Sequence, residues 1–272
     1  MLPPNTSRAR RRPLPPKAEK PPSRKAFVFD RAGNVSYDGG RNISAPFKLT
    51  WEVCLLLPVI ATLALTWGLC MPLYFGLKNR GWQVPSLVFK ALPTAMAAAF
   101  AGWAALSLHA GRYAWLIFAG LCVCVAADVL LNIRFEVGGG FFFCGHVLYV
   151  LALSQYRVLN WWCLALFLLS AVALQFFLRH YQAKVPTPFI LLGLRLYALA
   201  LAALLALGLP LPFLAFSPPT VMAALGAVLF VLSDLTLCHN TLLQKPTGWH
   251  FVSLGVYYAG QLLLGLSAIP IS

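Results

Sequence analysis

The chain has 272 residues, of which 60% are hydrophobic and 10% are charged. A soluble globular domain carries about 25% charged residues, and the apolar residues here come in long blocks that lack the alternation of barrel strands. The composition therefore excludes an ordinary soluble domain and a β-barrel, and it predicts an all-α membrane protein with about eight transmembrane helices. The formal charge of +14 does not indicate nucleic-acid binding, because eleven of the 21 Lys and Arg residues precede residue 49.

Residues 1–48 form the first region, which is basic and rich in proline. Such a composition cannot bury enough apolar surface to fold, so we expect a disordered tail. A basic segment beside the first membrane span acts as a topology signal or contacts anionic lipids. Residues 49–272 are then expected to form one eight-helix transmembrane domain.

Eight apolar segments follow the tail, each close to the roughly 20 residues that cross a bilayer. They cover residues 52–76, 87–108, 113–132, 138–156, 160–178, 188–209, 218–239 and 250–268. Eight crossings place both termini on one side of the membrane. The basic tail predicts that this side is cytosolic, whereas the short loops carry six Lys and Arg residues opposite the tail and two beside it. We favour the orientation that the tail predicts, with both termini in the cytosol, because the first helix usually dominates orientation.

Two carboxylates lie well inside the apolar segments. Asp128 falls late in the third segment and Asp234 late in the seventh. Since both segments run in the same direction, the two side chains are expected to approach the same membrane face. A carboxylate at mid-membrane costs roughly 2.5–3.5 kcal/mol on insertion scales, so it predicts a functional site.

Other polar side chains fall in the same half of the bilayer when depth is counted at about 1.5 Å per residue. They are Lys90, His146, Tyr149, Arg195, Tyr257, Tyr258 and Gln261, with Ser233 next to Asp234. This grouping predicts a cavity that opens to water or headgroups at one leaflet. The alternatives are an Asp paired with Lys90 or Arg195 to join helices, and a His146 that only bonds helix to helix.

Paired carboxylates suit acid–base chemistry, because one can hold a proton near neutral pH while the other stays ionised. Ser233 is not set in a nucleophile motif. The histidines do not provide the three or four ligands of a zinc site, so we expect neither a metal nor another cofactor.

Five short motifs resemble the YhhN-like lysoplasmalogenase family of multi-pass membrane proteins. They are FKALP at 89–93, ADVLL at 127–131, GHVLY at 145–149, ALGAVLFVLSDLTL at 224–237 and YYAGQLLLGLS at 257–267. Their order and spacing carry the resemblance. Ala127 stands where the family typically has glycine; both residues are small enough for close helix packing.

The resemblance implies hydrolysis of the vinyl ether bond of a lysophospholipid, which is a lysoplasmalogen, within the membrane. The products would be a fatty aldehyde and glycerophosphocholine or glycerophosphoethanolamine. It implies Asp128 as the acid and Asp234 as its partner, or the reverse, with Lys90 and Arg195 as phosphate contacts. His146, Tyr149, Tyr258 and Gln261 would support the site or position water. In a eukaryote it implies the endoplasmic reticulum or another endomembrane.

Two functions of other classes fit the same residues. In a proton-coupled transporter, the aspartate pair would relay protons. In a non-catalytic lipid-binding protein, the same cavity would hold a lipid without changing it.

Overall fold

The computed structural model describes residues 27–29, 35–37, 45–156 and 160–270. It divides into two units, residues 1–48 and residues 49–272. In the first unit, strand β1 (Phe27–Phe29) pairs antiparallel with β2 (Val35–Tyr37), with Phe27 opposite Tyr37. Most of the expected disordered tail lies outside the described residues, so that prediction stays open.

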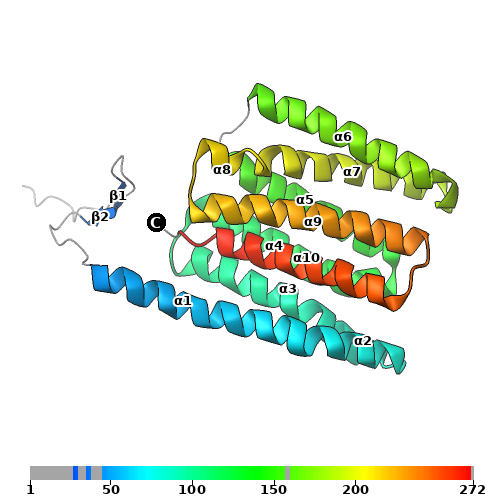
Figure 1. Cartoon of the computed structure of the whole chain (residues 1–272), viewed down its shortest axis with the longest axis horizontal. Coiled ribbons are helices and arrows are strands. Elements are labelled where there is room, and N and C mark those ends of the chain that lie inside the picture. Colours follow the sequence, from blue (N-terminus) through cyan, green and yellow to red (C-terminus); the bar gives the residue numbers. More distant parts are fainter. Residues whose placement is uncertain (1–26, 30–34, 38–44, 157–159, 271–272) are drawn as a thin grey trace, which may run out of the picture. The chain divides into compact units, whose positions relative to one another are not determined.

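The second unit is a bundle of long helices (Figure 1). The first rod consists of α1 (Ala45–Leu65), the π-helical turn η1 (Thr66–Cys70) and α2 (Met71–Asn79). The remaining elements are α3 (Gln83–Leu106), α4 (Gly111–Ile133), α5 (Phe135–Leu153), η2 (Ser154–Tyr156), α6 (Trp161–Tyr181), η3 (Gln182–Lys184), α7 (Pro188–Gly208), α8 (Leu211–Leu214), α9 (Pro218–Leu242) and α10 (Thr247–Ser267).

Seven helical stretches in the described part of the chain are long and apolar enough to cross a membrane. They begin at Leu55 and continue through α9, so the chain is an integral, multi-pass membrane protein of the all-α class, as the composition predicts. The eighth expected segment is also a helix, α10, but it is not among the seven. It carries polar residues in its first half and packs against α9 and α3.

Polar caps and prolines set the helix starts. Ser217 caps α9 in a capping box, in which its hydroxyl accepts from the Thr220 amide and the Thr220 hydroxyl accepts from the Ser217 amide. Thr187 caps α7 in a similar way, and both helices have proline in the first turn, where its missing amide proton is not needed. The helix ends therefore fall close to the Pro- and Gly-containing loops that the sequence indicates.

On α3 small residues face the interior, and many large apolar residues lie on the outside of the bundle. The face of α3 that contacts its neighbours is built from alanines such as Ala97, Ala101 and Ala104, all fully buried. Trp161, Phe189 and many other large apolar side chains are exposed on the outside. This distribution fits helices that approach closely in the interior and face lipid elsewhere.

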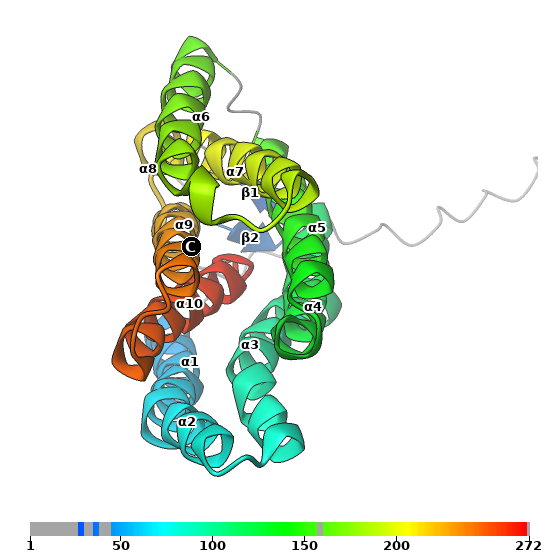
Figure 2. The same cartoon turned by 90° about the vertical axis from the view of Figure 1, so that its right-hand side faces the viewer.

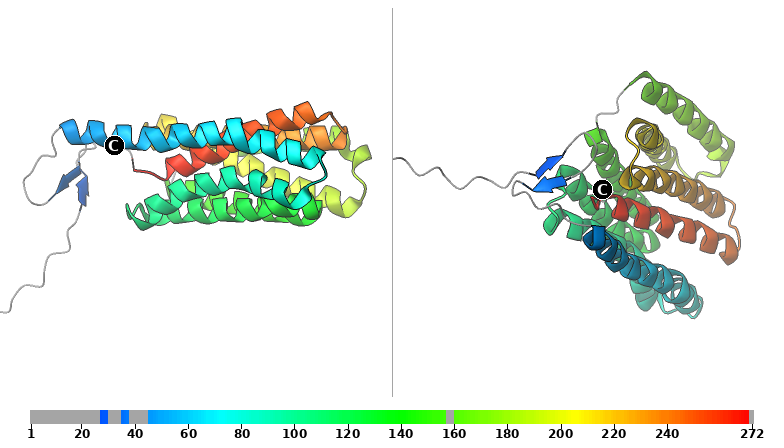
Figure 3. Two further views of the ribbon diagram at one scale, coloured as in Figure 1. Left: turned by 90° about the horizontal axis from the view of Figure 1, so that it is seen from below. Right: turned by 60° about the vertical axis from the view of Figure 1, so that its left-hand side comes forward.

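Neighbouring helices in the chain pack as pairs, α3 with α4, α4 with α5, α6 with α7 and α9 with α10. The view along the helices places α6 at one edge, beside α7, and the α1–α2 rod at the opposite edge, beside α3 (Figure 2). The turns α2–α3, α4–α5, α6–α7 and α9–α10 meet at one end of the bundle (Figures 1 and 3). We call this the turn end; the start of α1 and the end of α10 lie at the other end.

Candidate active site

Both aspartates line one polar cavity of about 240 Å³ near the turn end. Asp128 comes from the last turns of α4 and Asp234 from the second half of α9. The cavity is lined by Tyr74, Phe75, Lys78, Asn79, Lys90, Asp128, Leu131, Asn132, Phe135, Phe142, Ser233, Asp234, Leu237, Thr241, His250, Ser253, Leu254 and Tyr257. Five helices, α2, α3, α4, α9 and α10, thus bring carboxylates, amines and hydroxyls to one space between them.

The Asp128 carboxylate is held by two hydroxyl groups. Thr94 on α3 and Tyr257 on α10 both donate to its Oδ2, at 2.6 and 3.0 Å. Asp128 is 1% exposed, and Thr94 and Tyr257 are buried as well. Two donors aimed at one oxygen compensate the loss of water around a buried carboxylate.

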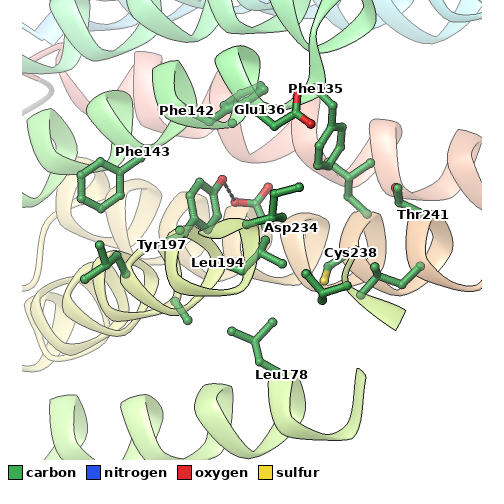
Figure 4. A pocket seen from close by; sticks show the side chains of 18 of the residues that line it. Phe135, Glu136, Phe142, Phe143, Leu178, Leu194, Tyr197, Asp234, Cys238 and Thr241 are labelled. Carbon is green, nitrogen blue, oxygen red and sulfur yellow. Dashed lines mark hydrogen bonds between the residues drawn. The ribbon is translucent and has the colours of Figure 1, made fainter. Parts of the chain in front are cut away.

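The Asp234 carboxylate has a different environment. Tyr197 on α7 donates to its Oδ2 at 2.6 Å, as Figure 4 shows. Nε2 of the fully buried His146, on α5, lies 3.3 Å from the same oxygen. The other ring nitrogen, Nδ1, lies 2.6 Å from the carbonyl oxygen of Phe142. Asp234 is therefore held between a phenol and an imidazole whose orientation is fixed by its own helix.

A second, apolar cavity of about 540 Å³ adjoins the first at Asp234 (Figure 4). Its walls come mainly from α5, α6, α7 and α9, and its side chains are mostly Leu, Phe and Ile. Residues that line both cavities are Leu131, Phe135, Phe142, Asp234, Leu237 and Thr241. The Asp234 carboxylate thus lies at the boundary between polar and apolar space.

Lys90 lines the polar cavity although it is only 5% exposed. Among the described residues its ammonium group makes neither a hydrogen bond nor an ion pair, and no Lys or Arg lies within 4.0 Å of either carboxylate. The helix-joining pairs considered from the sequence are thus not formed in the described part of the chain. A buried cation that faces a cavity and makes no direct hydrogen bond or ion pair is suited to hold an anionic group.

The structure does not place all the expected site residues at the cavities. Ser233 and Tyr257 line the polar one. Tyr149 and Gln261 are fully buried, bond to each other at 2.7 Å and line neither cavity. These two form a polar contact within the core rather than a group that faces substrate.

Tyr258 and Arg195 also lie away from both cavities. Tyr258 donates to the backbone carbonyl of Lys90, which lies close to Pro93 in α3. Because proline lacks an amide proton, Pro93 interrupts the backbone hydrogen bonds of this helix. Arg195 is exposed on α7, so its position does not bring it to a phosphate in the polar cavity.

Several residues at the site were not predicted from the sequence. Thr94 and Tyr197 donate to the two carboxylates, and Lys78, His250 and Ser253 are among those that line the polar cavity. Tyr197 could have been found by the depth count, since it lies in the same half of its helix as the other polar residues. Thr94 gives no such signal, because threonine is common in apolar helices. In the described residues, no three His, Cys, Asp or Glu side chains are grouped to hold a metal ion.

Comparison with known proteins gives a family match over residues 85–268, described as the YhhN family. A rat protein named lysoplasmalogenase TMEM86B is 31% identical over 161 residues, which are 58% of this chain and 64% of the rat protein. The human protein of the same name is 31% identical over 171 residues, 62% of this chain and 70% of that protein. No solved structure matches the chain.

The match to the rat relative spans less than two thirds of that protein's length. The family match, by contrast, covers more than half of this chain and includes α3 through α10, with both aspartates. The chain therefore belongs to the YhhN family.

Proposed function

We propose that the protein is a lysoplasmalogenase, which hydrolyses the vinyl ether bond of lysoplasmenylcholine or lysoplasmenylethanolamine. The products are a fatty aldehyde and glycerophosphocholine or glycerophosphoethanolamine. The observation that carries the proposal is the placement of both carboxylates on one polar cavity, with Asp234 at its border with an apolar cavity. The names of the rat and human relatives support the choice of reaction.

The reaction needs an acid and a stabilising anion. A carboxylic acid gives its proton to the β-carbon of the vinyl ether, and an oxocarbenium ion forms at the carbon bonded to oxygen. Water adds to this carbon and loses a proton to a carboxylate, and the hemiacetal that results breaks into aldehyde and glycerol hydroxyl. A second carboxylate stabilises the cation, in analogy with the paired carboxylates of glycosidases.

The hydrogen-bond pattern favours Asp234 as the acid. A carbonyl oxygen can only accept, so Nδ1 of His146 carries a hydrogen toward Phe142. Nε2 makes no hydrogen bond to another described group and faces only Asp234. A lone pair opposite an ionised carboxylate would be repulsive, so one more proton belongs between His146 and Asp234. That proton is the one available for carbon protonation.

Asp128 then takes the part of the ionised partner. Its Oδ2 receives hydrogen bonds from two hydroxyl donors, Thr94 and Tyr257, which suits a carboxylate that accepts rather than donates. Lys90 lines the same cavity with a free ammonium group among the described residues, and we assign it to the phosphate of the substrate. In this assignment Asp234 is the acid and Asp128 is its partner, which is the reverse of the roles that the resemblance puts first.

The test is aldehyde release by the purified protein in detergent from lysoplasmenylethanolamine and lysoplasmenylcholine. Asp128→Asn and Asp234→Asn are each expected to reduce kcat by roughly 10²–10⁴, the contribution of acid–base groups. Tyr149→Phe is the matched control, because Tyr149 is buried and hydrogen-bonded but lines neither cavity. An acyl lysophospholipid should release no aldehyde.

Two outcomes would overturn the proposal. Folded wild-type protein that releases no aldehyde from either substrate would exclude the hydrolase. Unchanged lipid that crosses liposome membranes in a pH-dependent manner, lost in Asp234→Asn, would instead establish a carrier.

The cellular setting is proposed on the family resemblance and the basic tail. In a eukaryotic cell we place the protein in the endoplasmic reticulum or another endomembrane, where a tagged full-length chain should overlap with an endoplasmic reticulum marker. Contact of the tail with anionic lipid predicts that the protein, reconstituted in neutral nanodiscs, binds vesicles that contain phosphatidylserine more strongly than neutral vesicles. Overlap with the plasma membrane alone would contradict the first assignment.

A further inference from the structure

We propose that the apolar cavity is the binding site for the hydrocarbon chain of the substrate, and that its walls select chain length. The inference rests on the proposed function for the identity of the lipid. The occupant is one long, unbranched chain that enters from the vinyl ether carbon held at Asp234.

The order of polarity along the two cavities matches the order of polarity along the lipid. A lysoplasmalogen has a charged headgroup, then glycerol, then the vinyl ether, then hydrocarbon. The protein presents Lys78 and Lys90, then the two carboxylates, then the wall of Leu, Phe and Ile side chains on α5, α6 and α7. Because Asp234 lines both cavities, the bond to be broken and the acid meet where the two parts of the lipid meet.

The apolar cavity is also the larger of the two, about 540 Å³ against about 240 Å³. The polar cavity contains the charged side chains of Lys78, Lys90 and Asp128, whereas a hydrocarbon chain is favourably buried against the Leu and Phe side chains of the apolar cavity. The apolar cavity is therefore the one of the two that fits the chain.

Three glycines lie in the wall of the apolar cavity. Gly139 and Gly140 on α5 and Gly193 on α7 line it, and a Cβ atom added to any of them would meet no heavy atom within 4 Å. A side chain grown at Gly193 would thus enter space that a lipid chain would otherwise use.

The first test measures kcat/KM of Gly193→Leu on lysoplasmenylcholines whose chains have 8 to 18 carbons. We expect roughly a tenfold loss for the longest chains and less than a twofold change for the shortest, because a leucine takes the place of about four chain carbons. Gly68→Leu is the matched control, since Gly68 lies in η1, lines neither cavity and also has open space at its Cβ position.

If Gly193→Leu is not recovered as a folded protein, Gly140→Leu makes the same test from the opposite wall. Active Gly193→Leu protein with the wild-type profile over all chain lengths would overturn the chain site. No aldehyde from wild type at any chain length would instead overturn the proposed function, so the two failures are distinguishable.

The second test does not depend on turnover. An alkyl lysophosphocholine with a diazirine at the chain end cannot be hydrolysed as a vinyl ether, and on illumination it labels the residues around that end. Labelling is expected in Leu174–Leu178 of α6 and Phe189–Leu194 of α7, and it should fall in Gly193→Leu but not in Gly68→Leu. Labels confined to other helices would refute the chain site even if the enzyme is active.

Discussion

At the scale of the residue, the two aspartates differ in what surrounds them. Asp128 accepts from two hydroxyl groups, whereas Asp234 shares its Oδ2 between Tyr197 and the imidazole of His146. A hydroxyl donor can stabilise a negative carboxylate, but an imidazole can also share a proton with the carboxyl group. The proposed roles, Asp234 as the acid and Asp128 as the ionised partner, are based on this difference.

His146 should therefore act as a positioning residue through Asp234. His146→Gln keeps a polar side chain near the carboxylate but removes the ring that can share its proton. We expect kcat to fall about a hundredfold, at the low end of what a general acid contributes, while KM stays within about twofold. Steady-state kinetics on lysoplasmenylcholine and the thermal midpoint measure both effects. An unchanged kcat in folded protein would contradict the shared proton.

Tyr149 should show the opposite pattern. Its hydroxyl donates to Gln261 in the interior, and neither residue lines a cavity. Tyr149→Phe leaves the buried oxygen of Gln261 without this donor, so the free energy of unfolding should decrease by about 1–3 kcal/mol. The kcat should stay near the wild-type value. A large loss of kcat at unchanged stability would instead place Tyr149 in the reaction.

The sequence identifies the two carboxylates because an acidic residue inside an apolar segment is rare and costly. It does not separate His146, which contacts Asp234, from Tyr149, which lies one turn further along α5 in a core contact. The reason is physical. In a membrane both the lipid and the bundle interior are apolar, so hydropathy does not fix how a helix is rotated about its axis.

At the scale of the element, close helix contacts depend on glycines. On α10, a Cβ atom added at Gly265 would collide with the backbone carbonyl of Ala97 on α3, which cannot move aside as a flexible side chain could. On α9, a Cβ at Gly226 would approach Leu264 and the carbonyl of Gly260 on α10. These contacts position α10, and with it Tyr257, against Asp128.

Gly265→Ala should consequently separate α10 from α3. Overpacking at such a contact costs about 1–3 kcal/mol, so we expect a lower midpoint in thermal unfolding in detergent and a reduced kcat. Gly68→Ala is the matched control, because its Cβ would meet no heavy atom and alanine is the better helix former, by up to about 1 kcal/mol. Equal midpoints for the two variants would show that the close contact is not needed.

Helix positions were largely predictable, and helix irregularities were not. The expected segment 188–209 is the helix Pro188–Gly208, because apolar length and terminal Pro and Gly are local signals. The π-helical turn Thr66–Cys70 has no such signal in the sequence. It is a single turn between the α-helices α1 and α2, which is how π-helical turns usually occur.

At the scale of the whole molecule, the membrane orientation matters for function because it decides the leaflet at which the cavities lie. The loops and helix ends at the turn end carry Lys78, Arg80, Arg134, Arg179, Lys184 and Lys245. The sequence predicts that Arg112, Arg157 and the basic tail lie on the opposite side of the membrane. The two charge signals therefore compete, and the orientation decides which leaflet supplies the substrate.

We predict that the tail dominates, because the first span usually sets orientation. The tail would then be cytosolic, and the polar cavity would open toward the opposite leaflet. The sequons at Asn5 and Asn42 should remain unglycosylated when the full chain is expressed in eukaryotic cells, as a gel shift with and without glycosidase would show. A sequon inserted between Lys245 and Thr247, in the α9–α10 turn, should be modified and serves as the positive control. Modification of Asn5 or Asn42 but not of the inserted site would invert the topology, and the cytosolic leaflet would then supply the lysolipid.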